Sequence, residues 1–488
     1  MQAAVTTATL HGVDAVRVEV QADVSPGLPV FGIVGLPDIA VQEARDRVRA
    51  ALRTAGFEFP GSRVIVNLAP APLRKHGTGF DLPIALAVLC ATGQLPTHAF
   101  DCVAAVGELG LDATVREVPG MLAHAIGAVT RGDALLGPAG AHDVVSAVPG
   151  LSFRGLAHLA ALRQGLPAVR DVTETSSPQA FGAQVRLEEI AGHEIAKRCL
   201  IVAAAGGHHV LLTGPPGSGK TMLARALAGL LPPLDERERL ESALIHSVAG
   251  LDPRPCIEGR RPFRAPHHSC TVAGLVGGGT PPRPGEISLA HNGVLFLDEL
   301  PEFPPAALQA LRQPVEEGVV TLVRANGAVR YPGHVTLVSA MNPCPCGYAG
   351  DPHRRCTCAT GTVTRYQSRI GGPLFDRMDM TIRVDRIDPD LLLLDGPPTG
   401  LTTEAARSMV SDALAFAADG RAQGLRSTLS PDGRAELQGA ARSARMSGRA
   451  VTRLLRVART LADLERSTRI HDVHVAEALA YRSWGPHE

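Results

Sequence analysis

The pattern of hydrophobic and polar positions changes its period along the chain. Apolar and polar side chains alternate over residues 16–24, which predicts a half-buried strand. Residues 41–52 then carry apolar side chains at helical spacing behind Asp38, a residue type that caps helices. Further strand and helix patterns alternate after residue 64. This order of elements predicts an α+β domain over residues 1–170.

Changes in composition divide the rest of the chain. Residues 171–185 are polar and contain serine and proline, which predicts a linker. Residues 186–395 alternate buried-strand and helix patterns, as a central parallel α/β sheet requires. Residues 396–488 are rich in alanine, arginine and leucine, and an apolar stripe over 451–464 predicts an amphipathic helix. We therefore expect an α/β and α+β multidomain protein with an all-helical C-terminal domain.

The composition narrows the class of protein only slightly. The 488 residues are 45% hydrophobic and 20% charged, as in ordinary globular proteins. Lys plus Arg and Asp plus Glu both number 48, which excludes a uniformly basic nucleic-acid binder but not a local basic channel. The sequence lacks an apolar run of about 20 residues, and its first residues do not resemble a signal peptide. We expect a cytoplasmic protein with reduced cysteines and no membrane partner.

One glycine-rich segment carries the most specific chemical signal. It fits the pattern G-x-x-x-x-G-K-[ST], and it follows a strand pattern at 210–213 and precedes a helix pattern at 222–228. Its backbone N–H groups are expected to surround the phosphates of ATP, with Lys220 at the β- and γ-phosphates and Thr221 at Mg²⁺. The expected nucleotide-binding residues are Gly214, Pro215, Pro216, Gly217, Ser218, Gly219, Lys220 and Thr221.

A second buried-strand pattern, at 293–297, ends in two carboxylates. Asp298 at the end of such a strand is expected to hold Mg²⁺ together with Thr221. Glu299 is expected to be the catalytic base that polarises the attacking water. The two motifs together predict hydrolysis of a nucleoside triphosphate rather than binding alone.

Three further polar residues fit roles in the same reaction. Asn342 follows a strand pattern at 335–340 and is predicted to orient the attacking water. Arg377 is predicted to stabilise the γ-phosphate of a neighbouring subunit in trans, with Arg369 as the alternative. Arg449, with Arg453 as its alternative, is predicted to fold back over the nucleotide from the C-terminal helical domain.

Several motifs together resemble the ComM/YifB family of AAA+ ATPases, which is related to the magnesium chelatase ATPase subunit. The segments that carry the resemblance are the phosphate loop and residues 284–301, 341–347 and 368–377, with 34–38 and 66–71 in the N-terminal domain. The resemblance implies a hexameric homo-oligomeric ring that moves DNA, as a helicase or branch-migration translocase in recombination or natural transformation. It also implies an N-terminal domain similar to the Lon protease catalytic domain and ribosomal protein S5, and a C-terminal helical lid.

The resemblance to Lon does not predict peptide cleavage. A Lon-type site needs a serine nucleophile and a lysine base, and the corresponding residues 75–83 contain no serine. Lys75 and Thr78 are too close in sequence to replace that pair. We therefore expect the N-terminal domain to bind a partner or to stabilise the ring.

Four of the nine cysteines lie in one short segment with the spacing C-x-C-x9-C-x-C. Four thiolates from one loop can close a tetrahedral Zn²⁺ site. The spacing within each pair is tighter than the usual C-x2-C, so ordinary reduced cysteines are the alternative. The residues concerned are Cys344, Cys346, Cys356 and Cys358.

Two insertions qualify as loops that grip DNA in the pore of a ring. The first, at 259–268, contains Arg261 and Arg264. The second is a predicted hairpin in which Arg324 and Arg330 flank an Asn-Gly turn. Arginines at these positions would contact phosphates without sequence preference. The alternatives to a DNA motor are a chelatase-type motor for metal insertion and a protein-remodelling ATPase; beyond ATP, we expect no small-molecule substrate.

Overall fold

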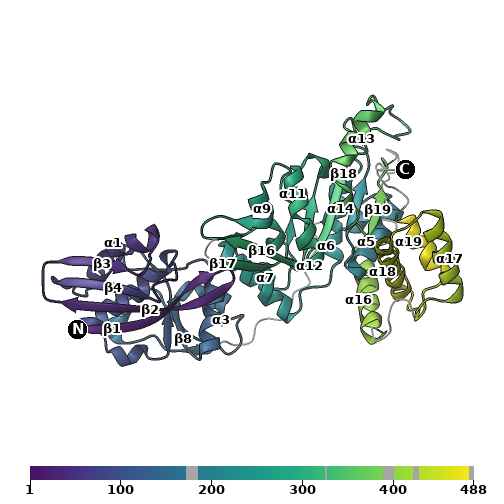
Figure 1. The fold of residues 1–488 in the computed structure, drawn as a ribbon. Helices are drawn as coiled ribbons and strands as arrows, with labels where there is room; N and C mark the ends of the chain where they lie inside the picture. The colour runs from purple at the N-terminus through teal and green to yellow at the C-terminus, as the bar shows by residue number, and fades with distance from the viewer. Residues whose placement is uncertain (172–184, 325–326, 388–400, 421–427, 483–488) are drawn as a thin grey trace.

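A computed structural model describes residues 1–171, 185–324, 327–387, 401–420 and 428–482. The chain forms an N-terminal part, a central part and a C-terminal group of helices, which follow one another along an elongated molecule (Figure 1). The predicted multidomain α/β and α+β class is confirmed. The predicted linker lies almost wholly outside the described residues, as does Asn326 in the turn of the predicted hairpin.

The N-terminal part is built on a mixed sheet of eight strands among the described residues. The spatial order of the strands is β10-β9-β8-β5-β1-β2-β4-β3. Their bounds are β1 Gln2–His11, β2 Asp14–Ser25, β3 Val30–Val34, β4 Arg63–Ala69, β5 Val103–Ala105, β8 Ala134–Pro138, β9 Ser152–Leu156 and β10 Arg170–Asp171, and β6 Glu108–Leu109 pairs with β7 Val115–Arg116 beside the sheet.

Successive residues of the inner strands point to opposite faces of this sheet. Ala105 and Leu136 pack in the core with α1 and α2, whereas Ala104 and Leu135 pack with α3. Helices therefore cover both faces. Asp38 caps α1 as predicted, accepting a 2.9 Å hydrogen bond from the N–H of Val41. The helices are α1 Ile39–Thr54, α2 Asp81–Ala91, α3 Met121–Arg131 and α4 His142–Val145.

The central part contains a five-stranded sheet in the order β12-β15-β18-β11-β19 within the described residues, and every pairing in it is parallel. The strands are β11 Val210–Thr213, β12 Phe263–Arg264, β15 Val294–Leu297, β18 Thr336–Met341 and β19 Met380–Arg383. The strand that leads into the phosphate loop, β11, lies between β18 and β19. The strand that ends in the two carboxylates, β15, is separated from it by β18.

Helices and two short hairpins surround this sheet. The hairpins are β13 Gly277–Gly278 with β14 Arg283–Pro284, and β16 Val319–Arg324 with β17 Gly327–Pro332. The helices of the central part are α5 Glu194–Gly206, α6 Lys220–Leu230, α7 Glu236–Ala249, α8 Arg254–Ile257, α9 Val272–Val276, α10 Glu286–Leu289, α11 Pro305–Ala310, α12 Arg312–Glu317, α13 Thr360–Ser368 and α14 Gly372–Phe375.

The C-terminal helices pack on the central sheet through α5. Leu454, Leu455, Ala458 and Leu461, four members of the predicted stripe, are buried in α18 in one core with α5, α6 and β11. The helices are α16 Thr403–Gly420, α17 Pro431–Ser443, α18 Gly448–Leu464 and α19 Asp472–Ala480. Of the helices in the described ranges, none combines the length and apolar character needed to cross a membrane.

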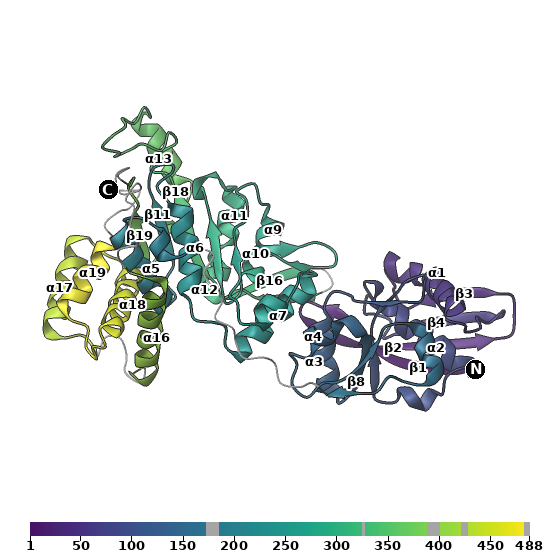
Figure 2. The ribbon, with the colours of Figure 1, turned by 180° about the vertical axis from the view of Figure 1, so that it is seen from behind.

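The N-terminal and central parts meet at two places. The backbone N–H of Gly120, at the start of α3, donates to the carbonyl oxygen of Ser247 in α7 over 2.8 Å, and α3 faces α7 in the view from behind (Figure 2). The turn between β1 and β2 reaches the second hairpin, because a Cβ built on Gly12 would lie only 2.7 Å from Val329 in β17. The N-terminal part therefore contacts the hairpin that carries Arg324 and Arg330.

Candidate nucleotide site

The phosphate loop connects β11 to α6 in a conformation that needs its glycines. Gly217 and Gly219 have φ angles of +76° and +88°, which other residues rarely adopt. No side chain caps the N-terminus of α6, so its first N–H groups face the loop. The buried hydroxyl oxygen of Ser218 has no hydrogen-bond partner among the described residues. Unused donors at a helix N-terminus fit the phosphates of ATP.

Lys220 is buried and already lies against this loop. Its Nζ donates to the carbonyl oxygens of Gly214 and Pro215 over 2.8 and 2.9 Å, and to Oδ1 of Asn342 over 3.3 Å. Burial lowers the pKa of Lys220, while the charges of Asp298 and Glu299 raise it. A phosphate would offer this ammonium group a charged partner in place of neutral carbonyls.

Thr221 and Asp298 form the pair expected to hold the metal. Thr221 Oγ1 donates to Oδ2 of Asp298 over 3.0 Å, which joins the first turn of α6 to the end of β15. A hydroxyl and a carboxylate at this distance can share one Mg²⁺, which prefers oxygen ligands and keeps several waters and phosphate oxygens as the others. The donor set therefore fits Mg²⁺ bound together with a nucleotide.

The strand order explains why Asn342 belongs to this site. Asn342 directly follows β18, and β18 lies between β11 and β15. In a parallel sheet the carboxyl ends of neighbouring strands lie at one edge. The amide of Asn342 is thereby held between Lys220 and the two carboxylates, where a water that attacks the γ-phosphate could be oriented. The role as water sensor itself stays a prediction.

Glu299 has a partner that the sequence did not suggest. Its backbone lies in the left-handed region, with φ of +50°, and its Oε2 lies 3.0 Å from Nδ1 of His268. His268 stands in the loop between β12 and α9, and its ring packs 4.0 Å from that of His267. The histidine ends the insertion at 259–268 that was predicted as a DNA loop, but the sequence did not connect it with Glu299, because only the pairing of β12 with β15 brings the two segments together.

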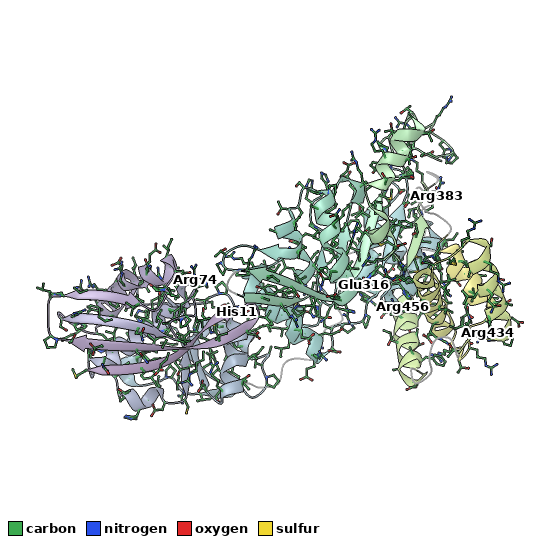
Figure 3. The ribbon with its side chains drawn as sticks, in the orientation of Figure 1. His11, Arg74, Glu316, Arg383, Arg434 and Arg456 are labelled. Carbon is green, nitrogen blue, oxygen red and sulfur yellow. The ribbon has the colours of Figure 1, made fainter. Side chains whose placement is uncertain are left out.

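Arg377 lies at the opposite edge of the sheet from the phosphate loop. The register of β11 with β19 pairs Thr213 with Arg383, so the loop follows the end of both strands whereas Arg377 precedes the start of β19. Four strand residues separate the two edges by about 13 Å. The guanidinium of Arg377 donates to Glu316 on α12, and Figure 3 draws Glu316 well below Arg383.

Arg449 lies in the first turn of α18. Arg453, one turn further along α18, has its pKa lowered by burial and by the charges of Arg377 and Arg449, and raised by Asp379 and Asp376. Three of these neighbours directly precede β19. The role of Arg449 at the nucleotide stays a prediction. Arg369, the alternative to Arg377, lies 3.4 Å from Glu302.

The four cysteines of the C-x-C pairs come together. Within the described residues, their Sγ atoms all lie within 4.8 Å of one another. The Sγ atoms of Cys344 and Cys346 lie 3.3 Å apart, well beyond the length of a disulfide bond. The residues are Cys344, Cys346, Cys356 and Cys358.

The four arginines predicted to contact DNA fall into two groups. Arg261 pairs with Glu238 over 2.8 Å, and Arg264 pairs with Glu286 over 2.6 Å. Both arginines therefore form salt bridges within the chain. Arg324 and Arg330 are exposed on β16 and β17, and among the described residues neither side chain has a hydrogen-bond or ion-pair partner.

Comparison with known families matches three successive stretches of the chain. Residues 186–392 match the family described as magnesium chelatase, subunit ChlI. Residues 20–140 match subunit ChlI of Mg-chelatase, and residues 403–482 match the C-terminal region of magnesium chelatase subunit ChlI. The phosphate loop, both carboxylates, Asn342 and Arg377 all fall within the first of these matches.

Two relatives resemble the chain over nearly its whole length. YifB of Escherichia coli is 40% identical over 483 residues, which cover 97% of this chain and 95% of YifB. Competence protein ComM of Haemophilus influenzae is 39% identical over 490 residues, covering 97% and 96%. The magnesium-chelatase 67 kDa subunit of Heliobacterium mobile is 30% identical over 193 residues, only 34% of this chain and 29% of that protein.

Proposed function

This chain belongs to the ComM/YifB family of AAA+ ATPases, related to the magnesium chelatase subunit ChlI, and on that premise we propose that it is a ring motor acting on DNA. The chain is an ATPase that uses ATP and Mg²⁺. We propose a homo-hexameric helicase or branch-migration translocase that works in recombination or natural transformation. The name of its relative ComM, a competence protein, supports DNA as the substrate.

The main structural support for DNA as the substrate is the pair of exposed arginines on the β16–β17 hairpin. Arg324 is paired in the strand register with Gly327 at the tip, whereas Arg330 is paired with Thr321, three pairs further back. Side chains alternate between the two faces of a strand, so the two arginines lie on opposite faces of the hairpin. Val323 at the tip is 75% exposed. An exposed hairpin with two positive charges suits a phosphate backbone. Repeated around a ring, it makes a basic pore in a chain whose formal net charge is zero.

ATPase measurements with and without single-stranded or branched DNA test this proposal. DNA is expected to bind and to raise the ATPase rate. The proposal fails if DNA neither binds the protein nor stimulates its ATPase activity, and if a Glu299→Gln variant with bound ATP also binds no DNA. A chelatase-type motor or a protein-remodelling ATPase would then be the better reading, and addition of tetrapyrrole or protein substrates would separate those two.

The double substitution Arg324→Ala with Arg330→Ala is expected to weaken DNA binding and DNA stimulation while leaving the basal ATPase rate unchanged. Each lost phosphate contact lowers the slope of log affinity against log salt by about 0.7 on single-stranded DNA. Fluorescence anisotropy with a labelled oligonucleotide at several salt concentrations measures both the affinity and this slope.

The matched control for the double substitution is Arg442→Ala, which removes an exposed arginine from α17. It is expected to leave the affinity and the slope as they are in the unsubstituted protein. Equal losses in the control and in the hairpin variant would mean that the hairpin has no special contact with DNA.

We also propose Zn²⁺ as a structural cofactor of the four-cysteine cluster. Zinc bound by four thiolates at about 2.3 Å in a tetrahedron separates the sulfur atoms by about 3.8 Å. The Sγ atoms of Cys344 and Cys346 each lie 3.6 Å from that of Cys356. The sulfur atoms therefore already have nearly the spacing that zinc requires.

A further inference from the structure

We propose that zinc in the cysteine loop, residues 343–358, acts as a positioning element for the phosphate loop and thereby sets the affinity for ATP. This inference rests on the zinc proposed for the cluster and on the ATP site, and it does not depend on DNA as the substrate. It assigns the cluster a role in the nucleotide site rather than in the fold alone.

The cysteine loop touches the phosphate loop directly. Gly347 directly follows Cys346, at the start of the nine-residue gap between Cys346 and Cys356. Its φ is +86°. A Cβ built on Gly347 would lie 2.5 Å from Cδ of Pro216, so only a glycine lets the two backbones approach this closely. Pro216 is the third residue of the phosphate loop, and any movement of Gly347 changes the space available to it.

The same loop is continuous with the residue that contacts Lys220. Asn342 precedes Cys344 by two residues, and Cys344 is fully buried. The carbonyl oxygen of Pro343 between them accepts a 2.9 Å hydrogen bond from Nε2 of Gln367 in α13. A metal bound to Cys344 would therefore fix the segment that holds the Asn342 amide 3.3 Å from Nζ of Lys220.

The outer half of the loop is tied to the end of β19. Arg383 donates to the carbonyl oxygen of Gly350, and Nε of Arg386 lies 3.5 Å from Oδ2 of Asp351. The guanidinium of Arg386 also lies 5.3 Å from the centre of the Tyr348 ring. These contacts join the loop to the strand that pairs with β11 on the side away from β18.

Zinc bound to the four cysteines would join the two halves of the loop. Two backbone N–H groups already point at the sulfur atoms, from Ala349 to Cys344 over 3.3 Å and from Cys358 to Cys356 over 3.4 Å. Such contacts orient ligands and stabilise thiolates. Because the segment 344–358 has no regular helix or strand, a metal would add to the contacts of Gly350 and Asp351 in holding Gly347 against Pro216.

Zinc content and ATP affinity of the full-length protein test the inference together. Elemental analysis is expected to give about one zinc per chain. The Cys356→Ser variant is expected to lose zinc and to bind a fluorescent ATP analogue about 10–100-fold more weakly, the range for residues that orient the ligands of a site. The control Cys102→Ser removes an exposed cysteine of the N-terminal part and is expected to change neither quantity.

Two further measurements keep the result interpretable if Cys356→Ser folds poorly. Removal of zinc from the unsubstituted protein by a chelator is expected to raise amide hydrogen exchange in residues 214–221, and added zinc is expected to restore protection. The Gly347→Val variant is expected to keep zinc and to lose ATP affinity. If the purified, unsubstituted protein contains no zinc, the proposed zinc site is wrong. If the protein keeps its full ATP affinity after zinc is removed, the cluster is not coupled to the phosphate loop.

Discussion

Replacement of Glu299 by glutamine is expected to lower kcat for ATP hydrolysis by about 10²–10⁴-fold, the contribution of a positioned general base. Glutamine has the same length and can still accept a hydrogen bond from His268, which lies 3.0 Å from Oε2. It cannot take a proton from water. The fold and the affinity for ATP with Mg²⁺ are therefore expected to persist, and both a steady-state phosphate-release assay and a nucleotide-binding titration should be measured.

Lys220→Ala serves as the contrasting variant for this prediction. It removes the cation that lies against Gly214 and Pro215, so it is expected to lose ATP affinity as well as turnover. Glu299→Gln protein that hydrolyses ATP at the normal rate would mean that another group polarises the water. In that case His268 would be the first residue to test, since its Nδ1 lies 3.0 Å from Oε2 of Glu299.

The sequence predicted the elements of the site well because each is local. The loop at 214–221 and the carboxylates at 298–299 each follow one buried strand, and β11 and β15 occur where the apolar runs predicted them. The order of the strands is not a local property. Only that order places Asn342 beside Lys220. The sequence could therefore indicate Asn342 as a candidate, but it could not predict its contact with Lys220.

Residues that act through tertiary contacts were missed or stay predictions. The sequence connected neither His268 with Glu299 nor Glu316 with Arg377, because these partners lie 31 and 61 residues apart in sequence. The role of Arg449 over the nucleotide stays a prediction, because it depends on how α18, which shares a core with α5, is placed when ATP binds. The domain boundaries at 170, 186 and 396 stay predictions, and two of them lie next to segments outside the described residues.

Replacement of Arg377 by alanine is expected to lower kcat by about 10³–10⁵-fold, the contribution of an arginine supplied to the γ-phosphate in phosphoryl transfer. About 13 Å of strand separates the two edges of the sheet, so Arg377 stands too far from the phosphate loop of its own chain to serve it. A neighbouring chain in a ring can present this edge to that loop. The ATPase rate and ATP affinity of the variant should be measured, and the affinity is expected to change far less than the rate.

Mixing two inactive variants decides whether the arginine acts between chains. Arg377→Ala chains keep Lys220 and Glu299, whereas Glu299→Gln chains keep Arg377. In randomly mixed rings with equal amounts of each, about a quarter of the sites pair an intact Glu299 with an intact Arg377 from the next chain. ATPase activity is therefore expected to return to about a quarter of the normal rate. If Arg377 served its own chain, every site in the mixture would lack one of the two groups, and the mixture would stay inactive.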